Sequence, residues 1–154
     1  MLRVLFVCTG NICRSPTAEG VVRTALADAG LDGHVTVASC GTHGYHVGDR
    51  ADERAIQAAR ARGIDIAGHR ARKLAHADFA TFDLMLAMDR GHLRQLERLR
   101  PAGARADLRL MLDYSSTAGD VPDPYYDGPA AFEAVLDLLE AATSGLLADL
   151  RQRL

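Results

Sequence analysis

Cys8 and Arg14 are the first residues whose types and spacing suggest chemistry. They lie in the segment CTGNICRSP, with five residues between them. Gly10 and Asn11, between them, readily adopt backbone conformations that other residues avoid. A loop that curls in this way turns successive backbone N–H groups inward, and the N-terminus of a following helix adds to their positive field. The segment therefore predicts a binding site for a tetrahedral anion.

The two side chains suit a reaction at such an anion. Arg14 can donate a two-pronged hydrogen bond to two phosphate oxygens. The positive field favours the thiolate of Cys8, which could then attack a cradled phosphorus atom. A free cysteine at a strand end is otherwise a small buried residue. The strand before the loop and the helix after it favour the chemical interpretation, whereas the Walker and dinucleotide patterns lack their lysine and third glycine here.

A second chemical group is needed if the phosphate is esterified to a phenol, because an acid should protonate the departing oxygen. Asp123, in VPDPYYDG, is the candidate, and it lies in the long polar loop Asp113–Gly128. Loops of this length in a compact domain are usually functional. From the residues alone, however, an aspartate beside a proline is by default a turn residue.

The elements that must position these groups follow from periodicity. Leu2–Val7 reads as a central strand buried on both faces, and the next helix has Ser15 as its cap, Pro16 as its first residue and Gly30 as its stop. The remaining pattern predicts strands at His34–Ser39, Phe82–Met88 and Asp107–Leu112, and helices from Asp49 or Asp52 to Arg62, at Ala75–Ala80, Arg90–Arg100 and Pro129–Arg153.

This alternation predicts an α/β fold, a four-stranded parallel sheet with helices on both faces and the phosphate-binding loop after strand 1. Ligands of such sheets bind at the carboxyl ends of the strands, where three of the predicted loops converge. We expect one domain, residues 1–154. The loop after the third strand begins with Asp89, which we expect to anchor it by pairing with Arg14.

Composition excludes several classes of function. The net charge of −2 gives no basic footprint for nucleic acid, and no apolar run is long enough to span a membrane. The three cysteines favour reactive thiols in a reducing compartment over a disulfide scaffold. With no signal peptide visible before the first strand, we expect a cytoplasmic protein, secretion without a classical signal being the alternative. The six histidines and three cysteines show no metal-ligand spacing.

The segments CTGNICRSP, SCGTHGYHVG, GHRAR, LAMD and VPDPYYDG, in this order, resemble the low-molecular-weight protein tyrosine phosphatases, bacterial type, along essentially the whole chain. The resemblance implies that Cys8 is the nucleophile, that Arg14 binds phosphate, and that Asp123 is the general acid and then the base. It also implies a phosphate-binding loop that includes Thr9, Gly10, Asn11, Ile12, Cys13 and Ser15.

The resemblance implies further roles around this loop. Ser39 and His69 would hold Asn11 in its strained conformation, while Ser15 would assist the thiolate as a leaving group. Tyr125 would form one wall of the substrate pocket and Tyr45 the other, where many relatives carry tryptophan. Tyr126 could add to the first wall, because its ring can pack on the ring of a phosphotyrosine. Thr9 and Ile12 would line the mouth of the pocket. Cys13 would trap oxidised Cys8 as a disulfide.

Two positions depart from the family pattern. Cys40 replaces the usual alanine, and we expect a buried small residue. His92 replaces the asparagine that is common after MD.

We therefore expect a phosphotyrosine-protein phosphatase whose partners are phosphotyrosine-containing proteins and small oxyanions, with no cofactor and no metal. A protein-arginine phosphatase is the near alternative, but that branch usually carries threonine at the position of Ile12 and lacks the paired tyrosines. An arsenate reductase on the same fold would need two further cysteines, and none follows Cys40. A phosphate-binding module without turnover is the alternative from another class.

Overall fold

Four parallel strands form the centre of the computed structural model, which describes all residues 1–154. They are β1 (Leu2–Cys8), β2 (Val35–Gly41), β3 (Leu84–Ala87) and β4 (Asp107–Leu110), and their order across the sheet is β2-β1-β3-β4. The inner strand β3 is buried and apolar throughout, and the inner strand β1 is buried and apolar from Val4 to Cys8, as expected of strands covered on both faces. The predicted fold class is confirmed.

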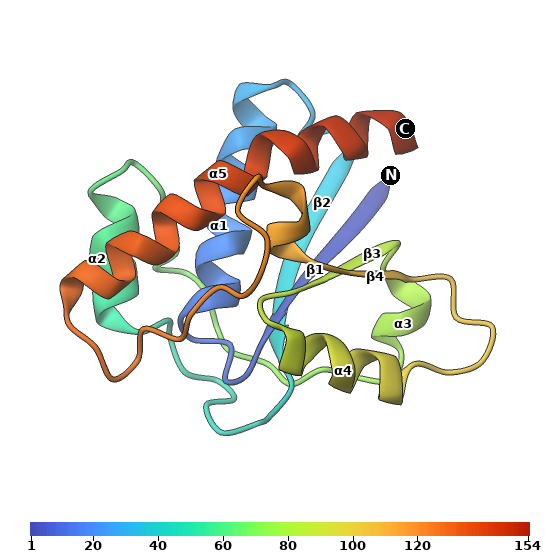
Figure 1. Cartoon of the computed structure of the whole chain (residues 1–154), viewed down its shortest axis with the longest axis horizontal. Helices are drawn as coiled ribbons and strands as arrows, with labels where there is room; N and C mark the ends of the chain where they lie inside the picture. The colour runs from blue at the N-terminus through green and yellow to red at the C-terminus, as the bar shows by residue number, and fades with distance from the viewer.

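The helices cover both faces of this sheet (Figure 1). They are α1 (Arg14–Asp28), α2 (Glu53–Arg60), α3 (Asp78–Thr81), α4 (Arg90–Leu99) and α5 (Pro129–Arg153), with a short 3-10 helix, η1 (Met111–Tyr114), after β4. Helix α1 packs on β1 and β2 and against α5, which in turn packs on α2, whereas α4 packs on β3 and β4. None of these helices has the length and apolar character needed to cross a bilayer.

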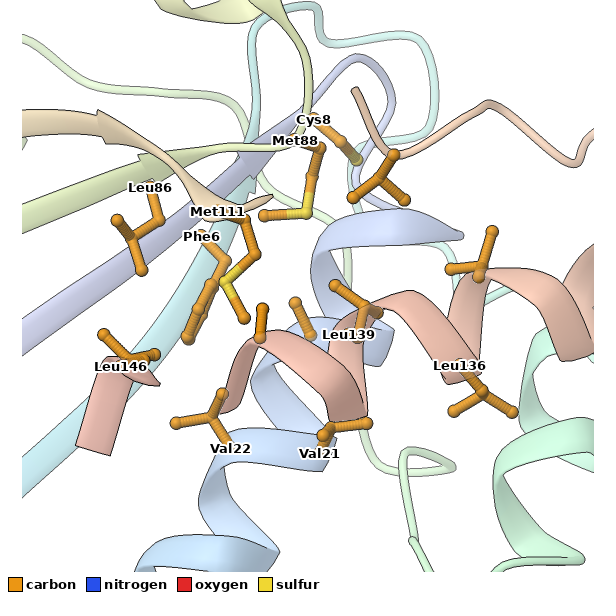
Figure 2. Packing of buried hydrophobic residues seen from close by; sticks show 14 of the residues in the cluster. Phe6, Cys8, Val21, Val22, Leu86, Met88, Met111, Leu136, Leu139 and Leu146 are labelled. Atoms are coloured by element: carbon orange, nitrogen blue, oxygen red, sulfur yellow. The ribbon is translucent and has the colours of Figure 1, made fainter. Parts of the chain in front are cut away.

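Alternate residues of β1 point into two separate cores. Phe6 belongs to the larger cluster, which α1 and α5 cover, and Leu5 belongs to the smaller cluster, which α4 covers. Both side chains are fully buried. Cys8 falls on the side of the larger cluster, and Figure 2 shows it with Met88 at one end of that cluster. The nucleophile candidate therefore ends a fully packed apolar layer, which fixes its position.

The chain reverses its direction of travel across the sheet after β2. It places β2 on one side of β1 and then returns to place β3 on the other side. The loop that follows β1 consequently lies at the topological switch point, where parallel α/β sheets bind their ligands.

Some predicted boundaries are wrong. The first helix begins at Arg14 with Cys13 as its N-cap and no side-chain cap, so Ser15 is not the capping residue. Its hydroxyl is instead used inside the loop. The fourth strand ends at Leu110, because the next residues turn into η1, whose Met111 and Leu112 are buried against α5.

The third strand spans only Leu84–Ala87 of the predicted Phe82–Met88. The short helix predicted at Ala75–Ala80 occupies Asp78–Thr81, because the Asp78 carboxylate accepts a hydrogen bond from the Ala75 N–H and holds the preceding residues in a turn. Helix α5 has the bounds that the sequence predicts.

Candidate active site

The loop of residues 8–15, called the phosphate loop below, directs its carbonyl groups outward. The carbonyls of Cys8 and Thr9 accept from the N–H groups of Thr42 and His43, at 2.8 and 3.0 Å. The Ile12 carbonyl accepts from the Asp52 N–H at 2.8 Å. Neighbouring segments of the chain therefore hold three carbonyls of the loop, and these hydrogen bonds fix its backbone conformation.

The N–H groups of the same loop point the other way. None of the backbone N–H groups of residues 9 to 15 donates to another part of the protein. Buried backbone donors are normally paired, so a consecutive run without partners marks an anion site. The N-terminus of α1 lies at the end of this run and adds its partial positive charge. The loop therefore has the inward-facing N–H groups that the predicted anion site requires.

Asn11 is the only non-glycine residue with a positive φ angle, 60°. Gly10 does not need one, contrary to the expectation that both residues would use unusual backbone angles. Gly10 is small for another reason, because a Cβ at this position would lie 2.9 Å from Cδ2 of His46. Asn11 therefore provides the left-handed turn of the chain, whereas the lack of a side chain at Gly10 leaves room for the His46 ring.

The conformation of Asn11 is fixed from both sides. Its side-chain amide donates to Oγ of Ser15 at 2.8 Å and of Ser39 at 3.0 Å, and its Oδ1 accepts from the Arg72 N–H at 2.9 Å. The His69 ring nitrogen Nε2 lies 2.8 Å from the Asn11 carbonyl. These four contacts hold the left-handed residue, which otherwise costs about 1 kcal/mol.

Ser15 connects this network to the nucleophile candidate. Its Oγ lies 2.9 Å from Sγ of Cys8, and both residues are buried. Because Asn11 donates to that oxygen, the single hydroxyl hydrogen of Ser15 is left for Cys8 or for the Cys40 carbonyl, which is 3.3 Å away. The shorter distance favours donation to the sulfur of Cys8.

Arg14 is buried and anchored through one of its terminal nitrogens. Nη1 donates to Oδ2 of Asp89 at 2.8 Å and to the Val121 carbonyl at 3.0 Å. The expected Asp89–Arg14 pair is therefore present. Nε and Nη2 stay available, and together they match two oxygens of a phosphate group.

Asp123 faces this guanidinium across the pocket. Its Oδ2 lies 3.9 Å from Nη2 of Arg14, while its Oδ1 accepts from the Tyr125 N–H at 3.1 Å. The Asp123 side chain is half exposed. One carboxylate oxygen is thus used to fix the residue, and the other faces the space above the phosphate loop.

Most of the site residues predicted from the sequence, all but Asn11, Ser15, Ser39 and His69, line one pocket of about 300 Å³. It is lined by Cys8, Thr9, Gly10, Ile12, Cys13, Arg14, Tyr45, His46, Asp123, Tyr125 and Tyr126. Tyr126 is 91% exposed at the rim, whereas Tyr125 is 37% exposed. Ser39 and His69 do not line the pocket, but both hold Asn11 in place.

Three contributors were missed by sequence reasoning. His46 lines the pocket, Glu19 accepts from the Ser39 hydroxyl at 2.7 Å, and Arg54 contacts the loop that carries Asp123. A lone histidine, glutamate or arginine carries no local signal, because each acts through contacts distant in sequence. The GYHVG segment carries part of the family resemblance, which gives a role to Tyr45 and none to His46.

His92 lies behind the phosphate loop and is buried. Its Nε2 lies 2.8 Å from Oγ1 of Thr9, and its Nδ1 lies 3.2 Å from Oδ1 of Asp89. Burial lowers the pKa of His92 to about 4, although the charge of Asp89 opposes this shift. For Asp89, burial favours a higher pKa, but hydrogen bonds from the His92 N–H and Arg14 outweigh it and hold that pKa low.

The other two cysteines are buried thiols. Burial, reinforced by the charge of Asp52, raises the pKa of Cys13 to about 12. Burial also raises the pKa of Cys40 well above its usual range. Cys40 lies in the smaller core, on the opposite face of the sheet from Cys8, as expected of a buried small residue.

Taken together, a thiol and an arginine in one amide-lined loop, with a carboxylate above them, define a cysteine-dependent phosphatase site. Residues 3–154 match the family described as low molecular weight phosphotyrosine protein phosphatase, and the chain belongs to this family.

Named relatives agree with this assignment. A low molecular weight protein-tyrosine-phosphatase of Streptomyces coelicolor is 48% identical over 158 residues, covering 98% of this chain and 94% of the relative. The crystal structure of a protein tyrosine phosphatase from Entamoeba histolytica superposes with a TM-score of 0.95 at 34% identity, covering 99% of this chain and 98% of the other. A Drosophila arginine phosphatase superposes with a TM-score of 0.92 at 27% identity, covering 97% and 98%.

Proposed function

We propose that this protein hydrolyses phosphotyrosine in proteins, through a phosphate ester of Cys8. The observation that carries the proposal is the run of unpartnered N–H groups from residue 9 to residue 15, most of whose residues line the same pocket as Cys8. Arg14 and these amides bind the dianion and stabilise the charge of the transition state without a metal ion. The proposed reaction therefore needs no metal ion.

The reaction has two steps. In the first, Sγ of Cys8 attacks phosphorus, the bond to the aryl oxygen breaks, and Asp123 gives its proton to that oxygen. In the second step, the oxygen of a water molecule attacks phosphorus while the Asp123 carboxylate takes a proton from that water molecule. The sulfur–phosphorus bond then breaks, inorganic phosphate leaves, and the Ser15 hydroxyl donates to the departing thiolate.

Phosphotyrosine is favoured over phosphoarginine by the residues at the pocket mouth. Ile12 fills the position where the arginine-specific branch usually carries threonine, and Tyr125 and Tyr126 offer aromatic surface to a phenyl ring. The likeness to an arginine phosphatase shows that the fold does not separate the two substrates. Tyr45, 71% exposed and stacked on His43 with ring centroids 5.0 Å apart, completes this surface in place of tryptophan.

The three cysteines are buried and form no disulfide, which suits a reducing compartment, and we place the enzyme in the cytoplasm.

Cys13 is next to the nucleophile in the pocket, so it stays the candidate partner for a disulfide with oxidised Cys8. The raised pKa of Cys13 keeps its thiol protonated at neutral pH, which makes this reaction slow.

The experiment compares phosphotyrosine, phosphoarginine and phosphoserine peptides with wild-type protein, Cys8→Ser and Asp123→Asn. Phosphotyrosine should be the preferred substrate, and Cys8→Ser should abolish turnover while still binding vanadate. Binding without turnover in the wild type would favour the non-catalytic alternative.

Removing the acid tests the role of Asp123. Asp123→Asn should lower kcat/KM for phenyl phosphate by about 10²–10⁴-fold, the usual contribution of a general acid. The loss should be much smaller for 4-nitrophenyl phosphate, whose leaving group needs little protonation. Equal losses for both esters would remove Asp123 from the acid role.

A further inference from the structure

Arg54, in the first turn of α2, makes a bidentate contact with the N-cap residue of its own helix. Its Nε donates to Oδ1 of Asp52 at 3.0 Å, and its Nη2 donates to Oδ2 at 2.9 Å. These hydrogen bonds hold the pKa of Asp52 below its usual range. An ion pair of this kind at the surface normally contributes little, so it does not by itself explain the residue.

The same guanidinium also reaches residues 120–128, called the acid loop below because it carries Asp123. Nη2 donates to the Tyr125 carbonyl at 2.8 Å, and Nη1 donates to the Asp127 carbonyl at 3.2 Å. The guanidinium carbon lies 5.5 Å from the ring centroid of Tyr125 and 4.6 Å from that of Phe132 in α5. Arg54 therefore holds the acid loop by two hydrogen bonds to main-chain carbonyls and by a cation–π contact with the Tyr125 ring.

The contacts continue from the acid loop to the proposed acid. Tyr125 accepts from Arg54 through its carbonyl and donates from its own N–H to Oδ1 of Asp123. The carbonyl that Arg54 holds and the N–H that orients Asp123 thus belong to the same residue, in two consecutive peptide units. Because Oδ1 is engaged in this way, Oδ2 faces the pocket, 3.9 Å from Nη2 of Arg14.

The contacts also continue in the other direction, to the phosphate loop. The Asp52 N–H donates to the Ile12 carbonyl at 2.8 Å. Asp52, whose carboxylate accepts from Arg54, is therefore also hydrogen-bonded to the loop that carries Cys8. One guanidinium therefore joins the two halves of the site, which lie more than a hundred residues apart in the sequence.

We propose that Arg54 is a positioning residue, which sets the distance and orientation of Asp123 relative to Cys8 and so governs protonation of the leaving group. This inference rests on the proposed function. Lysine cannot reproduce the role, because it lacks the planar fork that serves Asp52 and two carbonyls at once.

The test measures kcat/KM for phenyl phosphate and 4-nitrophenyl phosphate with Arg54→Ala and Arg54→Lys. We expect Arg54→Ala to lower the value for phenyl phosphate by about 10- to 100-fold, the cost of misplacing a catalytic group by about 1 Å. For 4-nitrophenyl phosphate the loss should stay below about 3-fold, since protonation matters little there. Arg54→Lys, which keeps a cation beside Asp52, should show the same selectivity for the poor leaving group.

Arg50→Ala is the matched control. Arg50 precedes the same helix, is exposed, and pairs only with Glu53, at 3.8 Å. This variant should hydrolyse both esters as the wild type does. A double variant gives the second readout, because once Asp123→Asn has removed the acid, adding Arg54→Ala should lower kcat/KM for phenyl phosphate by less than about 2-fold.

The outcomes separate the two proposals. Wild-type protein that does not hydrolyse aryl phosphates overturns the proposed function itself. Active wild-type protein whose Arg54 variants lose both esters equally, or whose losses multiply with that of Asp123→Asn, overturns only the positioning role. Selective loss with Arg54→Lys, together with no further loss when Arg54→Lys is added to Asp123→Asn, supports it even where Arg54→Ala folds poorly.

Discussion

Mild acid should destabilise this protein through His92. The ring is buried with a pKa of about 4, whereas an unfolded histidine titrates near 6.5. Above pH 6.5 both states are neutral and His92 adds no pH dependence. As the pH falls from 6.5 to 4, the unfolded state binds a proton that the folded state does not, so stability is lost across this window and levels off below it.

The size of the loss follows from the two pKa values. A difference of this width corresponds to about 3 kcal/mol in full, of which about 2 kcal/mol is lost by pH 5. Urea unfolding at pH 7.5 and pH 5 measures it, with His92→Asn as the variant that does not titrate. Groups that do not contact His92 titrate equally in both proteins, and Asp89, whose pKa is held low, stays charged at both values of pH. The wild type should therefore lose about 2 kcal/mol more than the variant between these two values of pH.

Two charged neighbours, Asp89 and Arg14, affect the size of this loss. Asp89 raises the pKa of His92 while Arg14 lowers it, so a released Asp89 would change the size of the effect but not its sign. Equal losses in wild type and His92→Asn would refute the reasoning, because the ring would then titrate as freely in the folded state as in the unfolded one.

Two further predictions concern backbone geometry, and both are measured as free energies of unfolding in urea. Asn11→Ala should be less stable than Asn11→Gly by about 1 kcal/mol, because only glycine adopts a φ of 60° without strain; equal stabilities would contradict this. Gly145→Ala should cost more than about 2 kcal/mol, since its Cβ would meet the Tyr114 carbonyl oxygen, although helix propensity alone predicts a gain of about 1 kcal/mol. Gly33→Ala, with no atom near its Cβ, is the control and should be neutral.

The sequence predicts what is local in this protein. The buried run before Cys8 and the spacing to Arg14 define a strand, a loop and a helix by near neighbours alone, and the structure has all three. Ser15 shows the limit of such reasoning. A serine before a proline is a good helix cap, but here Asn11 and Cys8 use its hydroxyl, and the helix begins at Arg14, two residues before the predicted Pro16.

Residues that act across the fold were not predictable. Arg54 matters through carbonyls more than seventy residues away, and His46 through its approach to Gly10. Nothing near either residue in the chain marks it. The strand after Ala106 was predicted too long for a similar reason, since burial of Met111 against α5 decides where it ends.

The unpartnered amides of the phosphate loop make anions part of the energetics of folding. An oxyanion that binds only the folded chain stabilises it by RT ln(1 + [L]/Kd), about 2.7 kcal/mol at one hundred times the dissociation constant. Inorganic phosphate is both the product of the proposed reaction and a ligand of this kind. If the loop binds phosphate as proposed, destabilising variants outside the loop should therefore unfold at higher urea concentration in phosphate buffer than in a buffer without oxyanions.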